Sequence, residues 1–515
     1  MSQLETNKAV QMVNITKTFG SLVANNKVCL DIHKGEILSL LGENGSGKTT
    51  LMNMLSGIYL PDSGQIFVDG KEVSITSPRD AFNLRIGMIH QHFKLVPVLT
   101  AAENIILGLN ENRLVDLKSV AARIKEICDR YGFVVEPYKK VYDMSVSEKQ
   151  TLEIVKVLYR GADILILDEP TAVLTPQETD RLFAVMRNMK ADGKSIVIIT
   201  HKLHEVMAIS DRVAVLRKGQ YIGDIATAET NPQQLTDMMV GHAVTLNIDR
   251  PEPENLRECL VVKDLTVLDV DGVKKLDKVS FTAYGGEILG VAGISGSGQK
   301  ELLEAIAGLQ IVEPGSSMLY TAMDSEETVE LAGRNSMDIK KMGVRSAFVP
   351  EDRLGMGLVG SMSIPDNMML RTYGNGKSIF TDRKTPRGMA EKVVEELQVM
   401  TPGMNAPVRR MSGGNIQKVL VGREIAADPS LLMTAYAVRG LDINTSYTIY
   451  HLLNEQKKHG VAVIYVGEDL DVLLELCDRI LGLCAGKVSG IVDGRTIKKE
   501  EVGLLMTHLG QEEEA

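Results

Sequence analysis

The sequence predicts an α/β fold that occurs twice in one chain. Two glycine-rich turns each follow a short apolar run, the first after residues 36–41 and the second 251 positions later. Two further apolar runs, 164–167 and 196–199, are each followed by residues with helical periodicity. Short apolar runs of this kind are typical of buried parallel strands that helices connect. We therefore expect two tandem α/β domains.

Length and composition agree with a protein of more than one domain. The chain has 515 residues, which is more than one hydrophobic core usually supports. Its net charge of -10 argues against nucleic acid as a partner, because nucleic-acid binding usually leaves a basic surface. No stretch reaches the ~18–20 apolar residues that span a bilayer. The five cysteines are scattered without CxxC spacing, so we expect isolated buried thiols and no metal or disulfide.

The first glycine-rich turn matches the phosphate-loop pattern G-x-x-x-x-G-K-[ST] at every required position. It reads Gly42-Glu43-Asn44-Gly45-Ser46-Gly47-Lys48-Thr49, and Thr50 follows. In this pattern the backbone N–H groups surround the phosphates, the lysine reaches the β and γ oxygens, and the hydroxyl binds Mg²⁺. A helix from Thr49 onward would direct the positive end of its dipole at the same phosphates.

The second turn keeps its glycines and loses its charge. It reads Gly293-Ile294-Ser295-Gly296-Ser297-Gly298-Gln299-Lys300, so Gln299 occupies the lysine position. Each turn is preceded by the same Gly-Glu-Ile-Leu tetrapeptide, at residues 35–38 and 286–289. A Met-Ser pair occurs at 144–145 and again at 411–412, which is an offset of 267 residues. The two halves keep this offset as far as Leu203 and Leu470. We predict domains at 1–245 and 246–515, joined by a polar linker at 251–255.

Several polar residues follow predicted strands of the first half. Asp168 and Glu169 end the run 164–167, where a carboxylate can bind Mg²⁺ and a second can polarise water. Gln91 and His201 also follow strands, and each is open to a simpler explanation as an exposed glutamine or a capping histidine. Phe19 precedes the phosphate loop and is either an adenine-stacking residue or a core residue.

Together these motifs resemble the ATPase subunits of ABC transporters, in two copies over nearly the whole chain. Phe19 matches the family's aromatic stacking position, Gln91 its Q-loop, the pair 168–169 its Walker B carboxylates and His201 its switch histidine. Ser412-Gly413-Gly414-Asn415 matches the L-S-G-G-Q signature except for its final asparagine and for Met411 in place of the leading leucine. The resemblance implies two tandem P-loop NTPase domains, each with a helical subdomain. It also implies head-to-tail pairing, with each ATP between one domain's loop and the other's signature.

In such a pair one composite site is complete and the other is altered from both sides. The first loop and the second signature fill every catalytic and ATP-binding role. The second loop would face the first half's signature, where Val146 and Ser147 follow Ser145 in place of both glycines. The offsets place Ala435 opposite Asp168, Tyr436 opposite Glu169 and Glu468 opposite His201, while Glu351 occupies the Q-loop region. This site is expected not to hydrolyse ATP, and it either still binds nucleotide or is an empty structural site.

The resemblance also implies cofactors, partners and a location. ATP and Mg²⁺ are the expected ligands, and two transmembrane permease subunits are the expected partners on the cytoplasmic face of the membrane. An extracytoplasmic solute-binding protein would take part indirectly. The sequence 349–353 and the fused architecture are similar to importers of ribose, galactose and nucleosides, and His92-Phe93 after the Q-loop favours nucleosides over sugars. A more distant alternative is a soluble twin ATPase that acts on ribosomes.

Overall fold

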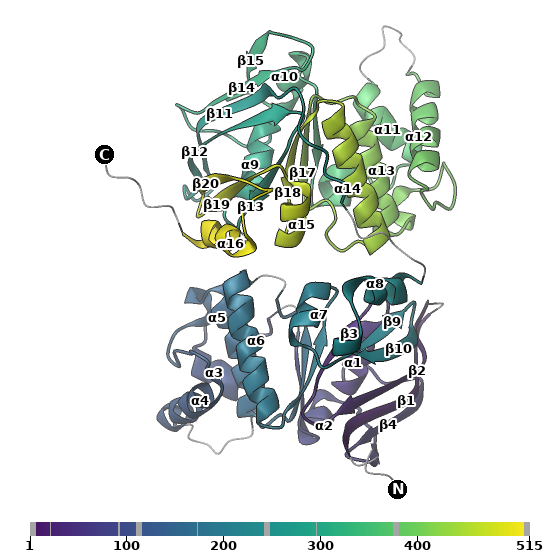
Figure 1. Ribbon diagram of the computed structural model, residues 1–515, viewed down its shortest axis with the longest axis vertical. Coiled ribbons are helices and arrows are strands. Elements are labelled where there is room, and N and C mark those ends of the chain that lie inside the picture. The colour runs from purple at the N-terminus through teal and green to yellow at the C-terminus, as the bar shows by residue number, and fades with distance from the viewer. Residues whose placement is uncertain are drawn as a thin grey trace. The chain divides into compact units, whose positions relative to one another are not determined.

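The computed structural model describes residues 7–20, 22–90, 93–109, 116–171, 174–241, 248–294, 296–373 and 381–508. The chain divides into two compact units, Met1–Thr245 and Leu246–Ala515 (Figure 1). Each unit contains a small antiparallel sheet, a larger mainly parallel sheet and a group of helices. Each is described by itself below.

The small sheet of the first unit has four antiparallel strands in the order β2-β1-β4-β5. Their bounds are Lys8–Phe19 for β1, Leu22–His33 for β2, Ser63–Val68 for β4 and Lys71–Val73 for β5. One face of β1 and β2 is buried, through side chains such as Ile15, Val28 and Ile32. Cys29, on β2, is exposed, so the expectation that all five thiols are buried is wrong for this one, because alternate side chains of a half-buried strand face solvent.

The larger sheet of the first unit has six strands in the order β10-β9-β3-β8-β7-β6. Their bounds are Ile37–Leu41 for β3, Ile86–Ile89 for β6, Ile164–Asp168 for β7, Ser195–Ile199 for β8, Arg212–Arg217 for β9 and Gln220–Ala226 for β10. Strands β6, β7, β8, β3 and β9 pair in parallel, and β10 is antiparallel to β9. Every residue of β3, β7 and β8 is buried, which confirms the predicted parallel α/β sheet. The carboxyl ends of these strands carry the polar residues singled out above.

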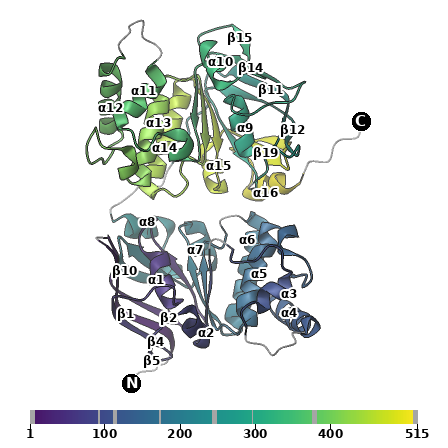
Figure 2. The same ribbon diagram turned by 180° about the vertical axis from the view of Figure 1, so that it is seen from behind.

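Helices complete the first unit. They are α1 (Lys48–Leu55), α2 (Pro78–Asn83), α3 (Ala101–Ile106), α4 (Leu117–Tyr131), α5 (Val146–Tyr159), α6 (Pro176–Ala191), α7 (Leu203–Ile209) and α8 (Pro232–Val240). Helices α3, α4 and α5 contact one another and form a helical subdomain. Figure 1 and Figure 2 both show this subdomain on the opposite side of the unit from β1, β2 and β4.

The second unit repeats this architecture. Its small sheet has the order β12-β11-β14-β15 and its larger sheet the order β16-β17-β18-β13-β19-β20. The strands are β11 (Arg257–Leu268), β12 (Lys274–Gly285), β13 (Ile288–Ala292), β14 (Ser317–Thr321), β15 (Thr328–Glu330), β16 (Ser346–Val349), β17 (Leu431–Ala435), β18 (Ala462–Val466), β19 (Arg479–Cys484) and β20 (Lys487–Asp493). The helices are α9 (Gln299–Ile306), α10 (Ser336–Lys341), α11 (Ile364–Thr372), α12 (Lys384–Glu396), α13 (Gly413–Ile425), α14 (Ile443–Lys458), α15 (Leu470–Leu476) and α16 (Lys499–Thr507). A π-helical segment, Arg353–Gly357, follows β16.

A buried ion pair explains the tetrapeptide that precedes each glycine-rich turn. Glu36 lies 2.8 Å from the Arg212 guanidinium in the first unit, and Glu287 lies 2.6 Å from Arg479 in the second. Each glutamate also accepts a hydrogen bond from the backbone N–H three residues before it. The glutamate therefore fixes the start of the central strand to the neighbouring strand in both units, which is a structural role.

The predicted polar linker at 251–255 begins as part of the second unit. Ile248 lies in the core of that unit, and Arg250 donates hydrogen bonds to the carbonyl oxygens of Leu474 (2.8 Å) and Cys477 (2.7 Å). The Pro251 carbonyl accepts from Lys457 at 2.5 Å. A polar, proline-marked composition predicted a linker, and these tertiary contacts attach its start to α14 and α15 of the second unit.

No helix within the described ranges is both long enough and apolar enough to cross a membrane. This finding agrees with the absence of a long apolar stretch in the sequence.

Candidate nucleotide-binding and catalytic site

The phosphate loop of the first unit has a backbone that only glycine fits at two of its positions. Gly47 has a φ of 97°, and a Cβ there would lie 2.3 Å from the Ala24 carbonyl oxygen. A Cβ at Gly42 would lie 2.2 Å from the Leu216 carbonyl oxygen. The loop is thus packed closely against two neighbouring segments, and glycine is required at both positions.

Lys48 begins α1 and is buried within the loop. Its ammonium donates hydrogen bonds to the carbonyl oxygens of Gly42 (2.7 Å) and Glu43 (3.0 Å). Burial lowers the pKa of Lys48 to about 8, and the nearby carboxylates of Glu169 and Asp168 oppose that change. The lysine keeps its charge at neutral pH and is held at the position where the pattern requires it.

Two oxygen groups suited to a hard cation lie next to the loop. Asp168 ends β7, and the Thr49 hydroxyl is 3.4 Å from its Oδ1. Burial raises the pKa of Asp168 to about 6, so its carboxylate is ionised at neutral pH. Hydroxyl and carboxylate oxygens are the ligands that Mg²⁺ prefers. Gln91, the third predicted metal-binding residue, lies outside the described residues.

Glu169 and His201 form a hydrogen-bonded pair beside Asp168. The Nδ1–H of His201 donates to Glu169 Oε1 at 2.9 Å, and this bond is the main cause that lowers the pKa of Glu169. The backbone of Glu169 has a φ of 47°, and its N–H donates to the Ile199 carbonyl oxygen at 2.9 Å. The His201 hydrogen bond favours the ionised carboxylate, which is the form that a general base requires.

The remaining predicted residues of the first unit lie around the same loop. Phe19 is 41% exposed, so the core alternative for this residue is wrong. Its ring meets that of Tyr59 edge to face, with centroids 5.2 Å apart. Tyr59 was not predicted from the sequence, because it belongs to none of the motifs described above. Asn44 is exposed, Thr50 is half-buried, and Ser46 is buried with no hydrogen-bond partner for its hydroxyl among the residues described.

The second unit keeps the shape of the loop without the charge. Gly296 and Gly298 have φ values of 89° and 106°, close to the 80° and 97° of Gly45 and Gly47. Gln299 is buried, and its amide donates to the Ile294 carbonyl oxygen at 3.0 Å. A Cβ at Gly293 would lie 2.5 Å from that amide. The Gln299 amide therefore bonds to a carbonyl oxygen of its own loop, as the Lys48 ammonium does, but it carries no positive charge. Ser295 lies outside the described residues.

The carboxyl ends of the second sheet carry different groups. Ala435 ends β17 and offers no oxygen ligand, and Lys300 extends from α9 to within 3.7 Å of Glu304. Tyr436 keeps the left-handed backbone of Glu169, with a φ of 50°, and its pKa is raised to about 12 by burial and by the carboxylates of Glu468 and Glu351. The carboxylates of Asp168 and Glu169 have no counterparts at these positions.

The signature of the second unit opens helix α13. Ser412 caps the helix, and its hydroxyl accepts hydrogen bonds from the Asn415 backbone N–H (3.4 Å) and side-chain amide (2.8 Å). Gly413 and Gly414 are the first two helical residues, so neither adds a side chain of its own at the helix N-terminus. In the first unit Ser145 caps α5 in the same way, but Val146 and Ser147 follow it. The first turn of α13 therefore lacks the two side chains that the first turn of α5 carries.

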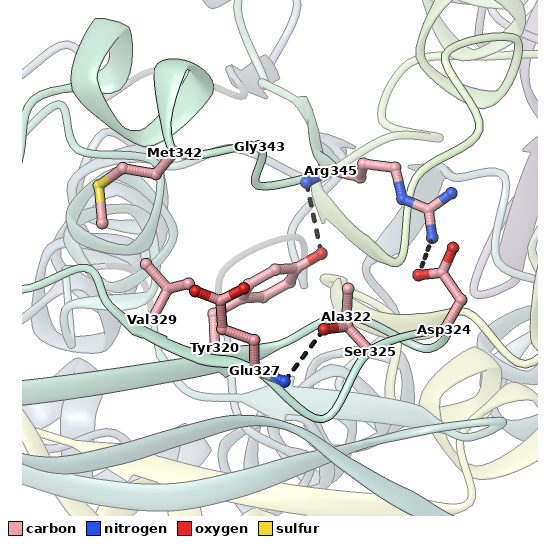
Figure 3. Close-up of a pocket in the computed structure, with 9 residues that line it drawn as sticks. All are labelled: Tyr320, Ala322, Asp324, Ser325, Glu327, Val329, Met342, Gly343 and Arg345. Carbon is pink, nitrogen blue, oxygen red and sulfur yellow. Dashed lines mark hydrogen bonds and ion pairs between the residues drawn. The ribbon is translucent and has the colours of Figure 1, made fainter.

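A shallow pocket of about 350 Å³ lies elsewhere in the second unit, between β14, β15 and the segment before β16 (Figure 3). Arg345 lines it, and its guanidinium is paired with Asp324 (2.8 Å) and Asp428 (3.1 Å). Its backbone N–H donates to the Tyr320 hydroxyl at 3.3 Å. The cation is already neutralised, and none of the predicted nucleotide-binding residues lines the pocket.

Comparison with known proteins identifies the family. The family model described as "ABC transporter" matches residues 25–172 and again residues 276–434. The chain belongs to the ABC transporter family. The two matches include both glycine-rich loops and both strands that precede the acidic or altered pair. The predicted tandem ABC ATPase domains are confirmed.

Curated relatives match the ABC chain over nearly its whole length. The nucleoside import ATP-binding protein NupA of Lactococcus lactis subsp. cremoris (strain MG1363) is 42% identical, over 96% of this chain and 97% of that protein. The guanosine import ATP-binding protein NupO of Bacillus subtilis (strain 168) is 40% identical, over 98% of each. The glucose import ATP-binding protein TsgD13 of Haloferax volcanii is 38% identical, over 97% of this chain and 95% of that protein. The protein is an ABC ATPase, similar to the ATP-binding subunits of importers.

Proposed function

We propose that this protein is the ATP-hydrolysing subunit of an importer for nucleosides, peripheral to the cytoplasmic face of the membrane. The observation that carries the proposal is the first unit's sheet edge, where Lys48, Asp168 and the Glu169–His201 pair surround the phosphate loop. Two permease subunits are the partners, and an extracytoplasmic solute-binding protein delivers the solute to them.

In the proposed site the loop residues and Lys48 hold the ATP phosphates, and Phe19 stacks on adenine. Thr49, Asp168 and Gln91 would hold Mg²⁺, and the hydroxyl and carboxylate of the first two already lie side by side. The ion would neutralise charge on the β and γ oxygens. Glu169 accepts a proton from the attacking water, and His201 fixes the orientation of that carboxylate through its Nδ1–H.

The proposed site is completed by the signature of the second unit. Ser412, Gly413 and Gly414 would supply a hydroxyl and two backbone N–H groups to the γ-phosphate. The other loop, with Gln299 and Lys300, would face Ser145 and Ser147 and would not hydrolyse ATP. The two glycines that open α13, compared with Val146 and Ser147 at the start of α5, support this assignment of one working site.

Nucleosides are the proposed solute, and ribose or a related sugar is the second candidate. Two of the relatives named above are nucleoside or guanosine import proteins, and the third is a glucose import protein. The His92-Phe93 pair after Gln91 favours the nucleoside type by resemblance. The test is ATPase activity of the chain assembled with its permeases and loaded binding protein. We expect stimulation by nucleosides and none by ribose; stimulation by ribose alone would overturn the nucleoside assignment.

The catalytic assignment is tested by Glu169→Gln. We expect loss of turnover by about 10²–10⁴, the range for removal of a general base, while ATP binding is retained because the phosphate contacts remain. Tyr436→Phe is the matched control in the second unit, and it should leave turnover unchanged because no carboxylate is lost there. Turnover of Glu169→Gln close to that of the wild type would contradict the assignment.

A further inference from the structure

The second unit carries a cluster of charges at the sheet edge where the first unit has its catalytic residues. Glu351 follows β16 as Gln91 follows β6, and Glu468 follows β18 as His201 follows β8. One arginine, Arg439, joins the two: its guanidinium pairs with Glu351, and its Nε lies 2.9 Å from Glu468 Oε1. Arg439 thus joins three segments that are far apart in sequence.

The cluster continues to a second arginine. The guanidinium of Arg353, two residues after Glu351, donates a hydrogen bond to the Arg439 carbonyl oxygen. Between these residues, Asp352 caps the π-helical segment through the N–H groups of Leu354 (3.2 Å) and Gly355 (2.8 Å). Arg353 is therefore held at both ends, by a capped backbone and by a carbonyl acceptor.

Arg353 also contacts the signature. A Cβ built on Gly413 would lie 3.0 Å from Arg353 Nη1, so the guanidinium covers that glycine. Gly414 is supported from the other side, since a Cβ there would lie 3.2 Å from both Asp442 Oδ2 and Thr445 Oγ1. Asp442 follows Arg439 by three residues and caps α14. Both signature glycines thus rest on segments that belong to the altered sheet edge.

We propose that Arg353 and Arg439 are positioning residues that hold the second unit's signature in place through contacts within that unit. The inference rests on the proposed function, in which this signature completes the ATP site of the first unit. Two carboxylates at the former glutamine and histidine positions supply fixed partners for Arg439. Where the first unit has a glutamine and a histidine, the second unit has two ion pairs to one arginine.

The test uses the full chain assembled with its permeases, and the variants Arg353→Met and Arg439→Met. Each keeps a long unbranched side chain but removes the charge and the hydrogen bonds. We expect turnover to fall roughly tenfold to a hundredfold, the cost of a small misplacement of catalytic groups. The affinity of the purified chain for ADP should not change, because ADP lacks the γ-phosphate that the signature would contact. Arg439→Lys should recover part of the turnover, since it keeps the charge but not the planar fork.

Two controls make the outcomes distinct. Arg387→Met removes an exposed arginine that pairs with Glu391 on α12, and it should leave turnover unchanged. Lys48→Ala tests the proposed function itself: if this variant still hydrolyses ATP, the proposed function fails. If Lys48→Ala is inactive but both Arg353→Met and Arg439→Met turn over like the wild type, the positioning role fails.

A second variant covers the case in which the arginine variants do not fold. Glu351→Gln with Glu468→Gln removes both charges while it keeps the shapes of the side chains. We expect a fall in turnover with unchanged ADP affinity and an unchanged thermal unfolding midpoint. Wild-type turnover in this folded double variant would overturn the proposal.

Discussion

At the level of single residues, burial shifts two charged groups of the first unit in opposite directions. It lowers the pKa of Lys48 to about 8 and raises that of Asp168 to about 6. Both groups are charged between these values, so the phosphate loop and the cation ligands are together ready only in that pH window. Glu169 differs from them, because the His201 hydrogen bond outweighs its burial and lowers its pKa.

The first prediction concerns the pH dependence of nucleotide binding. As pH rises through about 8, Lys48 of the nucleotide-free protein loses its proton and its charge. Above this pH the lysine must take up a proton before it can bind the phosphates as a cation. We expect the affinity for metal-free ADP to be flat below this pH and to fall above it, by at most about tenfold per pH unit. The dissociation constant measured between pH 7 and 9.5 checks this. Lys48→Arg is the control, because arginine stays charged throughout; a wild-type profile as flat as that of Lys48→Arg would contradict the prediction.

At the level of elements, a buried carboxylate in the second unit joins the sheet to the helical subdomain. Glu424, on α13, is fully buried and pairs with Arg371 on α11 and with Arg423, whose Nη2 is 2.7 Å away. It also accepts a hydrogen bond from the Phe348 N–H on β16 at 3.3 Å. In the first unit, Val157 lies at the matching place on α5 and packs over Gly87 of β6.

The second prediction is that Glu424→Ala destabilises the second unit. Removal of the carboxylate leaves the buried Arg423 guanidinium without its partner, which costs about 3–5 kcal/mol when one member of a buried pair is lost. Thermal or urea unfolding of the full chain measures it, and the expected sign is a lower midpoint for the transition of that unit. Arg387→Met is again the matched control, because its exposed pair contributes about 0–1 kcal/mol. Equal midpoints for the two variants would show that the buried network does not stabilise the unit.

The strands and the first-unit site could be predicted from the sequence because their signals are local. The run 164–167 is apolar and continuous, and the phosphate loop is defined by eight adjacent residues. The partners of Glu424 and Arg439 could not be predicted, because their contacts join residues 53 and 88 positions apart. Tyr59 has no motif, and the polar composition of 251–255 does not reveal the side chains that bind it. Local sequence patterns do not reveal polar contacts between residues that are far apart in the chain.

At the level of the whole molecule, the two units share a fold but carry different parts of the proposed site. The first has the charged loop and the acidic strand end, and the second has the signature with two glycines. The same serine cap begins α5 and α13, with Ser145 accepting from the Glu148 N–H at 3.2 Å and Ser412 from the Asn415 N–H at 3.4 Å. These caps are a matched pair for a test of the proposed head-to-tail site.

The third prediction compares Ser412→Ala with Ser145→Ala. Each removes a helix cap and should cost a similar ~1 kcal/mol of stability. Only Ser412 is proposed to contact the γ-phosphate at the working site, where a hydrogen bond to a charged group contributes about 1.5–3 kcal/mol. We therefore expect turnover to fall roughly tenfold to a hundredfold in Ser412→Ala and to stay near wild type in Ser145→Ala. ATPase assays of the assembled transporter measure both, and the reverse ranking would refute the pairing of the first loop with the second signature.

The left-handed turn at Glu169 recurs at Tyr436, with φ values of 47° and 50°. A non-glycine residue in this conformation costs about 1 kcal/mol or more. Glu169 carries a carboxylate at this position and Tyr436 does not, yet the Tyr436 N–H donates to the Val466 carbonyl oxygen at 2.9 Å, as the Glu169 N–H donates to that of Ile199. The turn therefore forms with or without a carboxylate and belongs to the sheet edge. A comparison of the two backbones alone would thus not distinguish the unit that carries the acidic pair from the unit that lacks it.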